Sequence, residues 1–381
     1  GRWMVPPRFS DGVATEAAAG RYLAAPLTAR RTQPAADLSA MDGYAMRADD
    51  LAGPWTVIGR SAAGRPFAQP LHPGQAVRIA TGALLPTDAG AVLLQEEASR
   101  DGDALSLLPG GTASARHIRR AGFDFASGAS LLPAGTAIGP GQIALALSAG
   151  HATLPVARLP RLAIMDSGDE LARDPASCAP HQIPASNGAM LAAMTAPHAA
   201  AITRIGPVAD TLEALAAALA GAQDAEVLVT SGGASVGDHD LIRPSLEAWG
   251  AEIAFWRVAI RPGKPLLVAR RGAQWIIGLP GNPVSSYVTA VLFLLPLLRA
   301  LAGAADPLPR ILHLPLAAPL PAAGARMEFV RARLTPDGVL PAAEQDSSAL
   351  LSLAGSDALI RRPAGSAAAS AGANAAVHLL A

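Results

Sequence analysis

Short apolar runs alternate with stretches of helical periodicity between residues 160 and 301. Strands are predicted at 161–165, 201–205, 226–230 and 275–279, and helices at 187–194, 210–219 (capped by Asp210), 241–249 and 284–301. Strands that alternate with helices in this way form a parallel sheet with helices on both faces. The predicted fold class is therefore multi-domain α/β, with a doubly wound α/β domain at its centre.

The residues on either side of this region have a different texture. Residues 13–27 show the apolar spacing of a short helix, and residues 52–135 consist of short apolar stretches interrupted by Gly, Pro and Asp, which is typical of β structure. Short strand-like pieces return after Asp306. We therefore expect four parts: an N-terminal domain (1–51 with 136–159), a β-rich lobe (52–135), the α/β domain (160–303) and a C-terminal β domain (304–381).

The charge balance excludes several classes of protein. The chain has 30 Lys+Arg against 30 Asp+Glu, which argues against a protein that binds nucleic acid or an anionic membrane through a large basic surface. Its single cysteine, Cys178, excludes an internal disulfide and any multi-cysteine metal site. We see no secretory leader, and expect a cytoplasmic protein. The apolar run from Val284 to Ala302 contains Pro296 and Arg299, and a buried helix explains it better than a membrane span.

Two loops that follow predicted strands carry candidate binding chemistry. The segment from Ser231 to Asp240 (SGGASVGDHD) offers glycines for close backbone approach, hydroxyls and carboxylates, so it could hold a phosphate and a divalent cation. The segment from Gly278 to Pro283 (GLPGNP) precedes Ser285 and holds its N–H groups in a rigid direction, suitable for an oxyanion. The alternatives are a tight capped turn and a stiff loop.

Acids and bases gather elsewhere in the same region. Asp166, Asp169 and Glu170 lie within five residues, a density that costs repulsion unless a cation sits among them; a solvated loop is the alternative. From Arg257 to Arg271 the chain has five basic residues and no acid, among them the protein's one lysine, Lys264. Arg257 and Arg261 share a face if the stretch is extended, and the lysine is suited to phosphate, although its place could be accidental.

The chain shows no motif of the common hydrolases. No histidine pair has the spacing of a zinc site, no Gly-x-Ser-x-Gly occurs, and the glycine loop lacks the Gly-Lys-Ser/Thr of a Walker A motif. Zinc chemistry and nucleophilic serine or cysteine catalysis are therefore not indicated.

Taken in order, these motifs resemble one family, the molybdopterin molybdenumtransferases, which are bacterial MoeA-like enzymes related to the C-terminal domain of gephyrin. The motifs are SAMDGYA (39–45), IATGA (79–83), GFD (122–124), SGDEL (167–171), TSGG (230–233), PGKP (262–265) and GLPGNPVS (278–285), with Arg326, Glu328 and Arg331 near the C-terminus. The resemblance covers nearly the whole chain.

The resemblance implies a transferase of molybdenum cofactor biosynthesis. Such an enzyme inserts molybdenum from molybdate into adenylylated molybdopterin, releases AMP and depends on a divalent cation, usually Mg²⁺. It implies an elongated homodimer whose site lies between the α/β domain of one subunit and the Met-Asp-Gly-Tyr part of the other. It implies neither a nucleic-acid partner nor a membrane, and allows transient contact with other cofactor-synthesis proteins.

The resemblance also implies roles for particular residues. Catalytic roles fall to Asp42, Glu170, Asp240 and Lys264. Substrate binding falls to Thr81, Ser231, Gly232, Gly233, Ser235, Arg257, Arg261, Pro280, Gly281, Asn282, Pro283 and Ser285. Metal binding falls to Asp124, Asp169, Glu170 and Asp240.

The chain departs from the family pattern at several positions. Ala185 stands where the family has an acid, Phe123 where an acid is usual before Asp124, and Asp166 where a serine is usual. Loss of the acid at Ala185 alters the expected cation ligands, and Asp166 could partly replace it. Two alternatives stay open: a molybdopterin adenylyltransferase, which residues 160–300 alone resemble, and a catalytically weakened paralogue that acts as a binding or scaffold protein.

Overall fold

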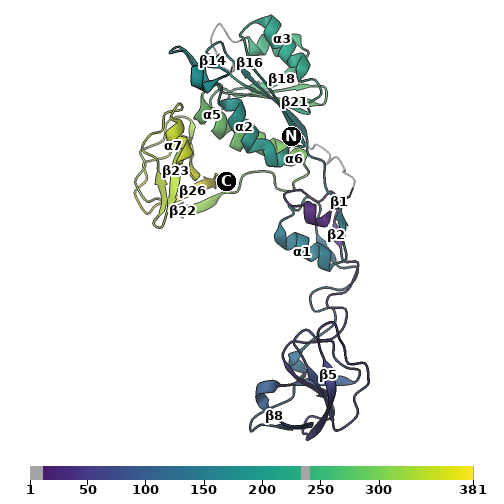
Figure 1. Cartoon of the computed structure of the whole chain (residues 1–381). Helices are drawn as coiled ribbons and strands as arrows, with labels where there is room; N and C mark the ends of the chain where they lie inside the picture. The colour runs from purple at the N-terminus through teal and green to yellow at the C-terminus, as the bar shows by residue number, and fades with distance from the viewer. Residues whose placement is uncertain (1–11, 233–240, 381) are drawn as a thin grey trace. The chain divides into compact units, whose positions relative to one another are not determined.

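The structure is a computed structural model that describes residues 12–232 and 241–380 of the 381. It divides into two compact units. Among the described residues, one unit comprises 20–24 with 156–380, and the other comprises 12–19 with 25–155. Figure 1 shows the elements within each unit.

The α/β domain is built on a six-stranded sheet. Its strand order is β16 (Ala201–Val208), β13 (Arg161–Ser167), β17 (Val227–Ser231), β21 (Gln274–Leu279), β20 (Leu267–Arg271) and β18 (Glu252–Trp256). The first four strands are parallel, as predicted. β20 is antiparallel to both of its neighbours, β21 and β18, and the sequence predicts neither β20 nor β18. Only two residues separate β20 from β21, too few for the helical crossover that a parallel pair needs.

Helices cover both faces of this sheet, which confirms the doubly wound arrangement. They are α2 (Asn187–Thr195), α3 (Leu212–Gly221), α4 (Ile242–Ala248), α5 (Pro283–Thr289), a π-helical turn (Ala290–Leu294) and α6 (Leu295–Leu301). Leu215 of α3 and Leu246 of α4 pack in one core, and Leu191 of α2 and Leu298 of α6 pack in another. The predicted Asp210 cap is wrong, because Thr211 Oγ1 instead accepts a hydrogen bond from the N–H of Ala214 at 3.2 Å.

The run Pro283–Leu301 has the length and mean hydropathy of a membrane span. More than half of its window is buried inside the structure, and the core helix of a folded domain passes the same test. Val284 and Val288 pack against Phe329, and Leu294 and Leu298 lie in the core under the sheet. The run is therefore explained as a core helix, as predicted.

The C-terminal β domain forms a second six-stranded sheet. Its strands are β22 (Leu312–Pro315), β23 (Met327–Thr335), β24 (Gly338–Pro341), β25 (Ala358–Arg362) and β26 (Asn374–Leu379), together with β19 (Ile260–Arg261); a short helix, α7 (Leu350–Ala354), precedes β25. β19 belongs to residues 257–271, which we call the basic segment of the α/β domain. It nevertheless pairs with β23, with Ile260 opposite Met327 and Arg261 opposite Glu328. The basic segment is thereby fixed between the two domains.

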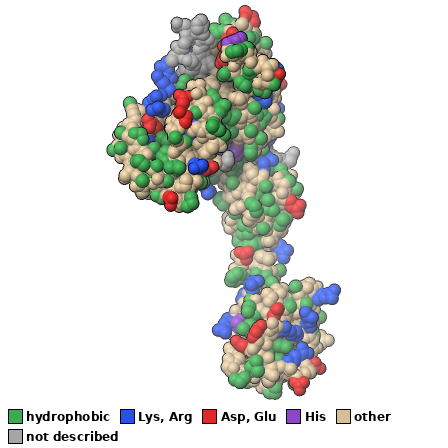
Figure 2. Space-filling view, turned by 60° about the vertical axis from the view of Figure 1, so that its left-hand side comes forward, with side chains coloured by type: hydrophobic (Ala, Val, Ile, Leu, Met, Phe, Trp, Pro, Cys, Tyr) green, Lys and Arg blue, Asp and Glu red, His purple; other side chains and the backbone are tan. Residues whose placement is uncertain are grey.

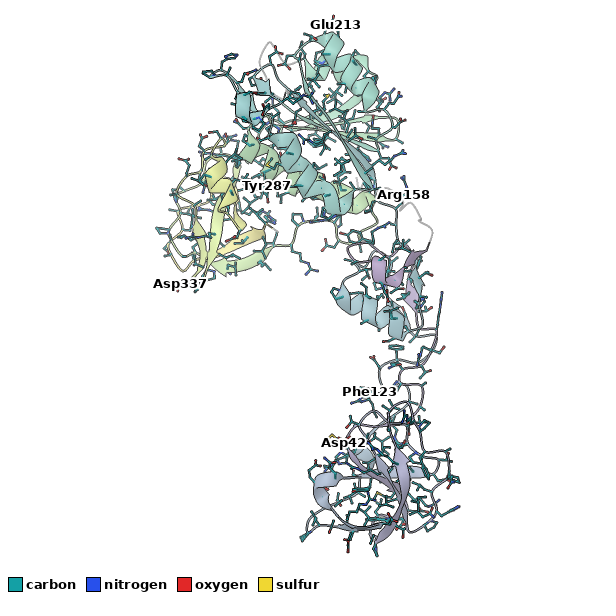
Figure 3. All side chains as sticks on the ribbon, in the orientation of Figure 1. Asp42, Phe123, Arg158, Glu213, Tyr287 and Asp337 are labelled. Atoms are coloured by element: carbon teal, nitrogen blue, oxygen red, sulfur yellow. The ribbon has the colours of Figure 1, made fainter. Side chains whose placement is uncertain are left out.

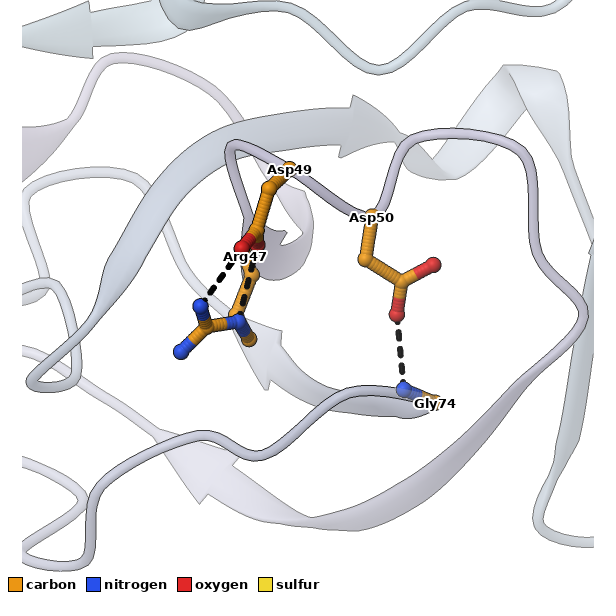
Figure 4. Close-up of polar contacts among 4 residues, drawn as sticks. All are labelled: Arg47, Asp49, Asp50 and Gly74. Atoms are coloured by element: carbon orange, nitrogen blue, oxygen red, sulfur yellow. Dashed lines mark hydrogen bonds and ion pairs between the residues drawn. The ribbon is translucent and has the colours of Figure 1, made fainter.

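The other unit contains the β-rich lobe. Its sheet has the order β7 (Ala89–Leu94), β4 (Gly43–Arg47), β6 (Gln75–Ile79), β5 (Trp55–Ser61), β9 (Ala104–Leu107) and β8 (Ala98–Asp101), and Trp55 and Met46 lie in its core. By strand pairing, β4 belongs to this sheet, whereas the sequence predicts that residues 1–51 belong to the N-terminal domain. The turn after β4 is fixed by Arg47, which donates two hydrogen bonds to Asp49, and by Asp50, which accepts one from Gly74 N–H at 2.7 Å (Figure 4).

The remaining elements are short. They are β1 (Val13–Ala14) with β12 (Thr153–Leu154), β2 (Leu27–Thr28) with β11 (Ser130–Leu132), β3 (Leu38–Ser39) with β10 (Ile118–Arg119), β14 (Leu171–Ala172) with β15 (Ile183–Pro184), and α1 (Pro140–Ser148). The helix predicted at 13–27 is wrong, because a single 3₁₀ turn (Thr15–Ala17) lies between β1 and β2. Pairing with residues far along the chain prevails over local periodicity here: Thr15 Oγ1 donates a buried hydrogen bond to His151 O at 2.7 Å.

Candidate functional site

The strands β13, β17 and β21 are neighbours and parallel, so the loops that follow them meet at one edge of the sheet. A pocket of about 690 Å³ lies there. It is lined by residues of all three loops, by the start of α2, and by Ser348 and Leu350 of the C-terminal β domain. We call it the large pocket.

Many of the predicted site residues lie in this pocket. They are Glu170, Ser231, Gly232, Pro280, Gly281, Asn282, Pro283 and Ser285. A second pocket of about 280 Å³, the small pocket, shares Pro265 and Ser285 with the first. Arg261 and Lys264 line it, as does Arg326. The structure therefore brings two of the predicted basic residues beside the predicted substrate loops.

The backbone around Lys264 is shaped by a glycine. Gly263 has φ of +102°, and a Cβ there would lie 2.5 Å from Thr289 Cγ2 of α5. Only glycine allows this approach of the basic segment to the helix without a shift of Thr289. The Pro-Gly-Lys-Pro motif thus fixes where the lysine enters the small pocket.

Arg257 does not behave as predicted. Its φ is +96°, which ends β18 at Trp256, and its N–H donates to Leu266 O at 2.9 Å. The stretch is therefore not one extended strand, and the prediction that Arg257 and Arg261 share a strand face is wrong. Arg257 lines neither the large nor the small pocket, whereas Arg261 lines the small one and pairs with Glu328 at 3.6 Å.

Three predicted residues belong to the other unit. Asp42 and Thr81 form a local pair, in which Asp42 Oδ1 accepts from Thr81 N at 2.6 Å and from Thr81 Oγ1 at 3.1 Å. These bonds lower the pKa of the Asp42 carboxyl. Asp124 donates its backbone N–H to Gln33 O at 3.0 Å, beside the exposed Phe123 (Figure 3). Gly233, Ser235 and Asp240 lie outside the described residues.

Carboxylates near the large pocket repel one another. Asp210 lines the pocket, and its N–H donates to Asp169 Oδ1 at 3.1 Å. Burial and the charges of Asp169 and Glu170 raise the pKa of Asp210. A bound cation would relieve this repulsion, since the oxygen donors are those that Mg²⁺ prefers.

Across residues 12–232 and 241–380, no group of three His, Cys, Asp or Glu residues is arranged to hold a metal ion. Mg²⁺ is commonly held by one or two carboxylates together with substrate phosphates and water, rather than by a complete protein cage. Glu170 and Asp210, which line the pocket, therefore fit a magnesium ion that arrives with a phosphorylated ligand.

Asn187 lines this pocket, although the sequence predicts for it only the start of a helix. Its Nδ2 donates to Ser231 Oγ at 2.9 Å and to Gly281 O at 2.6 Å. One side chain thus joins the glycine loop to the Pro-Gly-Asn-Pro loop. Its position as the first residue of α2, the first α-helix after β13, is the signal in the sequence that could have pointed to it.

Asp166, one of the acids that the sequence places near a cation, is only 4% exposed. Its Oδ2 accepts from the N–H of Gly188 at 3.0 Å, while its Oδ1 has no partner. Burial raises the pKa of Asp166 to about 6, against the opposing effects of the Gly188 hydrogen bond and the Arg204 charge. A buried acid thus supports the N-terminus of α2 next to Asn187.

The fold and the two pockets are those of a multi-domain protein built around a ligand-binding α/β domain. Residues 4–150 match the family described as MoeA N-terminal region (domain I and II), residues 163–300 match "Probable molybdopterin binding domain", and residues 313–380 match MoeA C-terminal region (domain IV). The chain belongs to the molybdopterin molybdenumtransferase family, which confirms the resemblance drawn from the sequence.

Relatives and solved structures agree with this assignment. The chain is 33% identical over 371 residues to the molybdopterin molybdenumtransferase of Bacillus subtilis, covering 93% of this chain and 86% of the relative. It is 36% identical over 304 residues to that of Nostoc sp., covering 76% of this chain and 69% of the relative. The crystal structure of the molybdopterin biosynthesis moeA protein from Pyrococcus horikoshii OT3 has the same fold, with a TM-score of 0.84, 24% identity, and coverage of 99% and 97%.

We expect Asp166→Asn to stabilise the protein at pH 7.5. The folded-state pKa of Asp166, about 6, exceeds the ordinary value of 3.8. The contribution of Asp166 to the free energy of unfolding is therefore largest below pH 3.8, where the carboxyl is protonated, and is lost as the pH rises through 6. Asparagine removes the buried charge and retains an acceptor for the N–H of Gly188. The free energy of unfolding is therefore expected to exceed that of the wild type by up to roughly 3 kcal/mol at pH 7.5, and by less towards pH 4. Thermal unfolding at both pH values measures it.

The matched control is Asp174→Asn, on the exposed Asp174 that accepts hydrogen bonds from Ala176 N and Ser177 Oγ. These bonds lower the pKa of Asp174, so its neutralisation is expected to bring no gain at pH 7.5. A gain at pH 4 as large as that at pH 7.5 would contradict the account of Asp166.

We expect Asn187→Ala to loosen the Pro-Gly-Asn-Pro loop, because it removes the donor to Gly281 O and leaves that carbonyl without this partner. Hydrogen–deuterium exchange of peptides that cover residues 278–285 is expected to accelerate about tenfold. Asn374→Ala, at an exposed asparagine of β26, is the control and is expected to leave these peptides unchanged. Equal exchange in both variants would show that Asn187 does not hold the loop.

Proposed function

We propose that this protein transfers molybdenum to molybdopterin in molybdenum cofactor biosynthesis, as a transferase. The observation that supports this most directly is the pair of adjoining pockets in a chain of this family. Asn187, Ser231, Glu170 and Asp210 line the large pocket, and Arg261 and Lys264 line the small one. The relatives that share its domains are named for the same transfer.

The finer proposal concerns the substrates. Adenylylated molybdopterin occupies the large pocket, and molybdate, a tetrahedral dianion, occupies the small pocket. Lys264, Arg261 and Arg326 supply positive charge there, and Ser285 lies where the two pockets meet. Cleavage of the adenylate then releases AMP.

The protein's own groups have distinct tasks in this reaction. Lys264 and Arg261 neutralise charge on the oxyanion, and Asn187 holds the two substrate loops in register. Glu170 and Asp210 would hold a magnesium ion, which supplies a Lewis acid at the phosphoryl oxygens when bound. Asp169, Asp124 and Asp240 remain proposed ligands from the family resemblance.

The quaternary proposal follows from the resemblance as well. The protein acts as a homodimer in the cytoplasm, with Asp42 and Thr81 of each subunit acting at the site of the other. The four-part division of the chain, with its boundary near residue 43 instead of 51, belongs to this proposal. Transient contact with other cofactor-synthesis proteins completes it.

Loss of the lysine tests the transferase reaction. Lys264→Ala is expected to lower AMP release from adenylylated molybdopterin, molybdate and Mg²⁺ by about 100-fold, because a charged contact to the reacting anion is lost. Lys264→Arg is expected to retain more activity than Lys264→Ala, since it keeps the charge. Arg243→Ala changes a surface arginine that pairs with Glu247 on α4, and is the control.

Three outcomes decide among the candidate functions. No AMP release by the wild-type protein above blank would overturn the transferase proposal. ATP turnover with free molybdopterin would favour the adenylyltransferase, although the family matches at 4–150 and 313–380 count against that alternative. Ligand binding without turnover would favour the scaffold alternative.

A mixing experiment tests the shared site. The inactive Asp42→Ala and Lys264→Ala proteins are unfolded and refolded together to form mixed dimers. If Asp42 acts at the partner's site, one of the two sites in each mixed dimer is intact. Each mixed dimer is then expected to have up to about half of the activity of a wild-type dimer. No recovery in a sample with proven mixed dimers would contradict a site shared between subunits.

A further inference from the structure

A loop of the C-terminal β domain lines both pockets. Gln345, Asp346 and Ser347 lie at the small pocket, and Ser348 and Leu350 lie at the large one. We call residues 344–350 the C-terminal loop. A loop that forms a wall of both pockets is placed to select what enters them.

The C-terminal loop is held by a buried cation. Arg331 is 1% exposed, and its guanidinium donates to the carbonyl oxygens of Glu344 at 3.0 Å, Asp346 at 2.8 Å and Ala349 at 2.9 Å. Gln345 adds two further bonds to the backbone of Arg331, at 3.0 and 2.9 Å. These bonds satisfy the loop carbonyls and favour one conformation.

The loop is also joined to the α/β domain. Asn282 Nδ2 donates to Ser347 Oγ at 2.9 Å, and the N–H of Val284 donates to Ser347 O at 3.2 Å. In addition, Leu353 of α7 packs with Val284 and Val288 of α5. The wall formed by the C-terminal loop is therefore fixed to the substrate loop that it faces.

Two large aliphatic side chains remain exposed where they line the large pocket. Ile183 of β15 is 53% exposed, and Leu350 of α7 is 45% exposed. They come from different domains of one unit, whereas the interior of the pocket carries Asp166, Ser167 and Asn187. Apolar walls with a few polar groups suit a flat heterocycle, whose faces are apolar and whose edge carries donors and acceptors.

We propose that Ile183 and Leu350 pack against a flat heterocyclic ring of a phosphorylated ligand, so that the C-terminal β domain takes part in ligand selection. The ring is that of either the adenylate or the pterin. This inference rests on the proposed function only in the choice of these two rings. It assigns to Ile183 and Leu350 the affinity for the ring, and leaves the affinity for the phosphate to other residues.

Leu351 provides a matched control. It follows Leu350 on the same short helix and is 90% exposed, but it does not line the large pocket. Truncation of Leu350 or Leu351 therefore removes the same atoms from the same element, and only the first is expected to change the binding of a ring.

The experiment measures the equilibrium binding of AMP, of a pterin monophosphate and of ribose 5-phosphate to the full-length protein by calorimetry. In the wild type, at least one ring ligand is expected to bind at least about tenfold more tightly than ribose 5-phosphate. Ile183→Ala and Leu350→Ala are each expected to weaken that ring ligand about fivefold and to leave ribose 5-phosphate unchanged. Leu351→Ala is expected to match the wild type, and unchanged thermal unfolding midpoints verify folding.

Which ring ligand weakens identifies the ring that the two side chains contact. Binding of both ring ligands no tighter than ribose 5-phosphate would overturn the inference, as would wild-type affinity in Ile183→Ala and Leu350→Ala, or an equal loss in Leu351→Ala. None of these results bears on the transferase reaction, because AMP release by the wild type is measured separately.

Discussion

The site depends on the register of three parallel strands. Asp166 of β13 pairs with Ser231 of β17, and Ser231 pairs with Leu279 of β21, so the three strands end within one residue of a single line across the sheet. Three loops start from this line: the loop after β13 that carries Asp169 and Glu170, the glycine-containing loop after β17, and the Pro-Gly-Asn-Pro loop after β21. Asn187 can then join two of them with a single side chain. A shift of one residue in any strand would turn its last side chain to the opposite face and separate these groups.

Much of this arrangement could be predicted from the sequence, because the strands of the α/β domain are continuous apolar runs and the loops after them carry recognisable motifs. What could not be predicted depends on contacts between distant residues. Residues 13–27 have helical spacing but pair with later strands, and β19 leaves the α/β sheet to pair with β23. The positive φ at Arg257 has no signal in residue type, since it is uncommon for any side chain except glycine.

The balanced charge of the chain conceals a local separation. Acidic and basic side chains are interspersed on the visible surface (Figure 2). Around the site, however, the small pocket is lined by three bases (Arg261, Lys264 and Arg326) and one acid (Asp346), while Glu170 and Asp210 line the large one. A site that is mainly basic at one end and acidic at the other suits a ligand with anionic groups together with a cation. Overall neutrality therefore excludes a polyanion partner without excluding a phosphorylated small molecule.

The contact between Asp166 and Gly188 constrains how this sequence can change over evolutionary time. A Cβ at position 188 would lie 2.1 Å from Asp166 Oδ2, and glycine is the residue type that avoids this overlap. As long as residue 166 is an aspartate, any side chain at position 188 would overlap sterically with its carboxylate. A smaller residue at position 166 would remove this overlap. Substitutions at these two positions are therefore expected to occur in a preferred order, with residue 166 changing first. Descendants of this chain would show the two positions varying together.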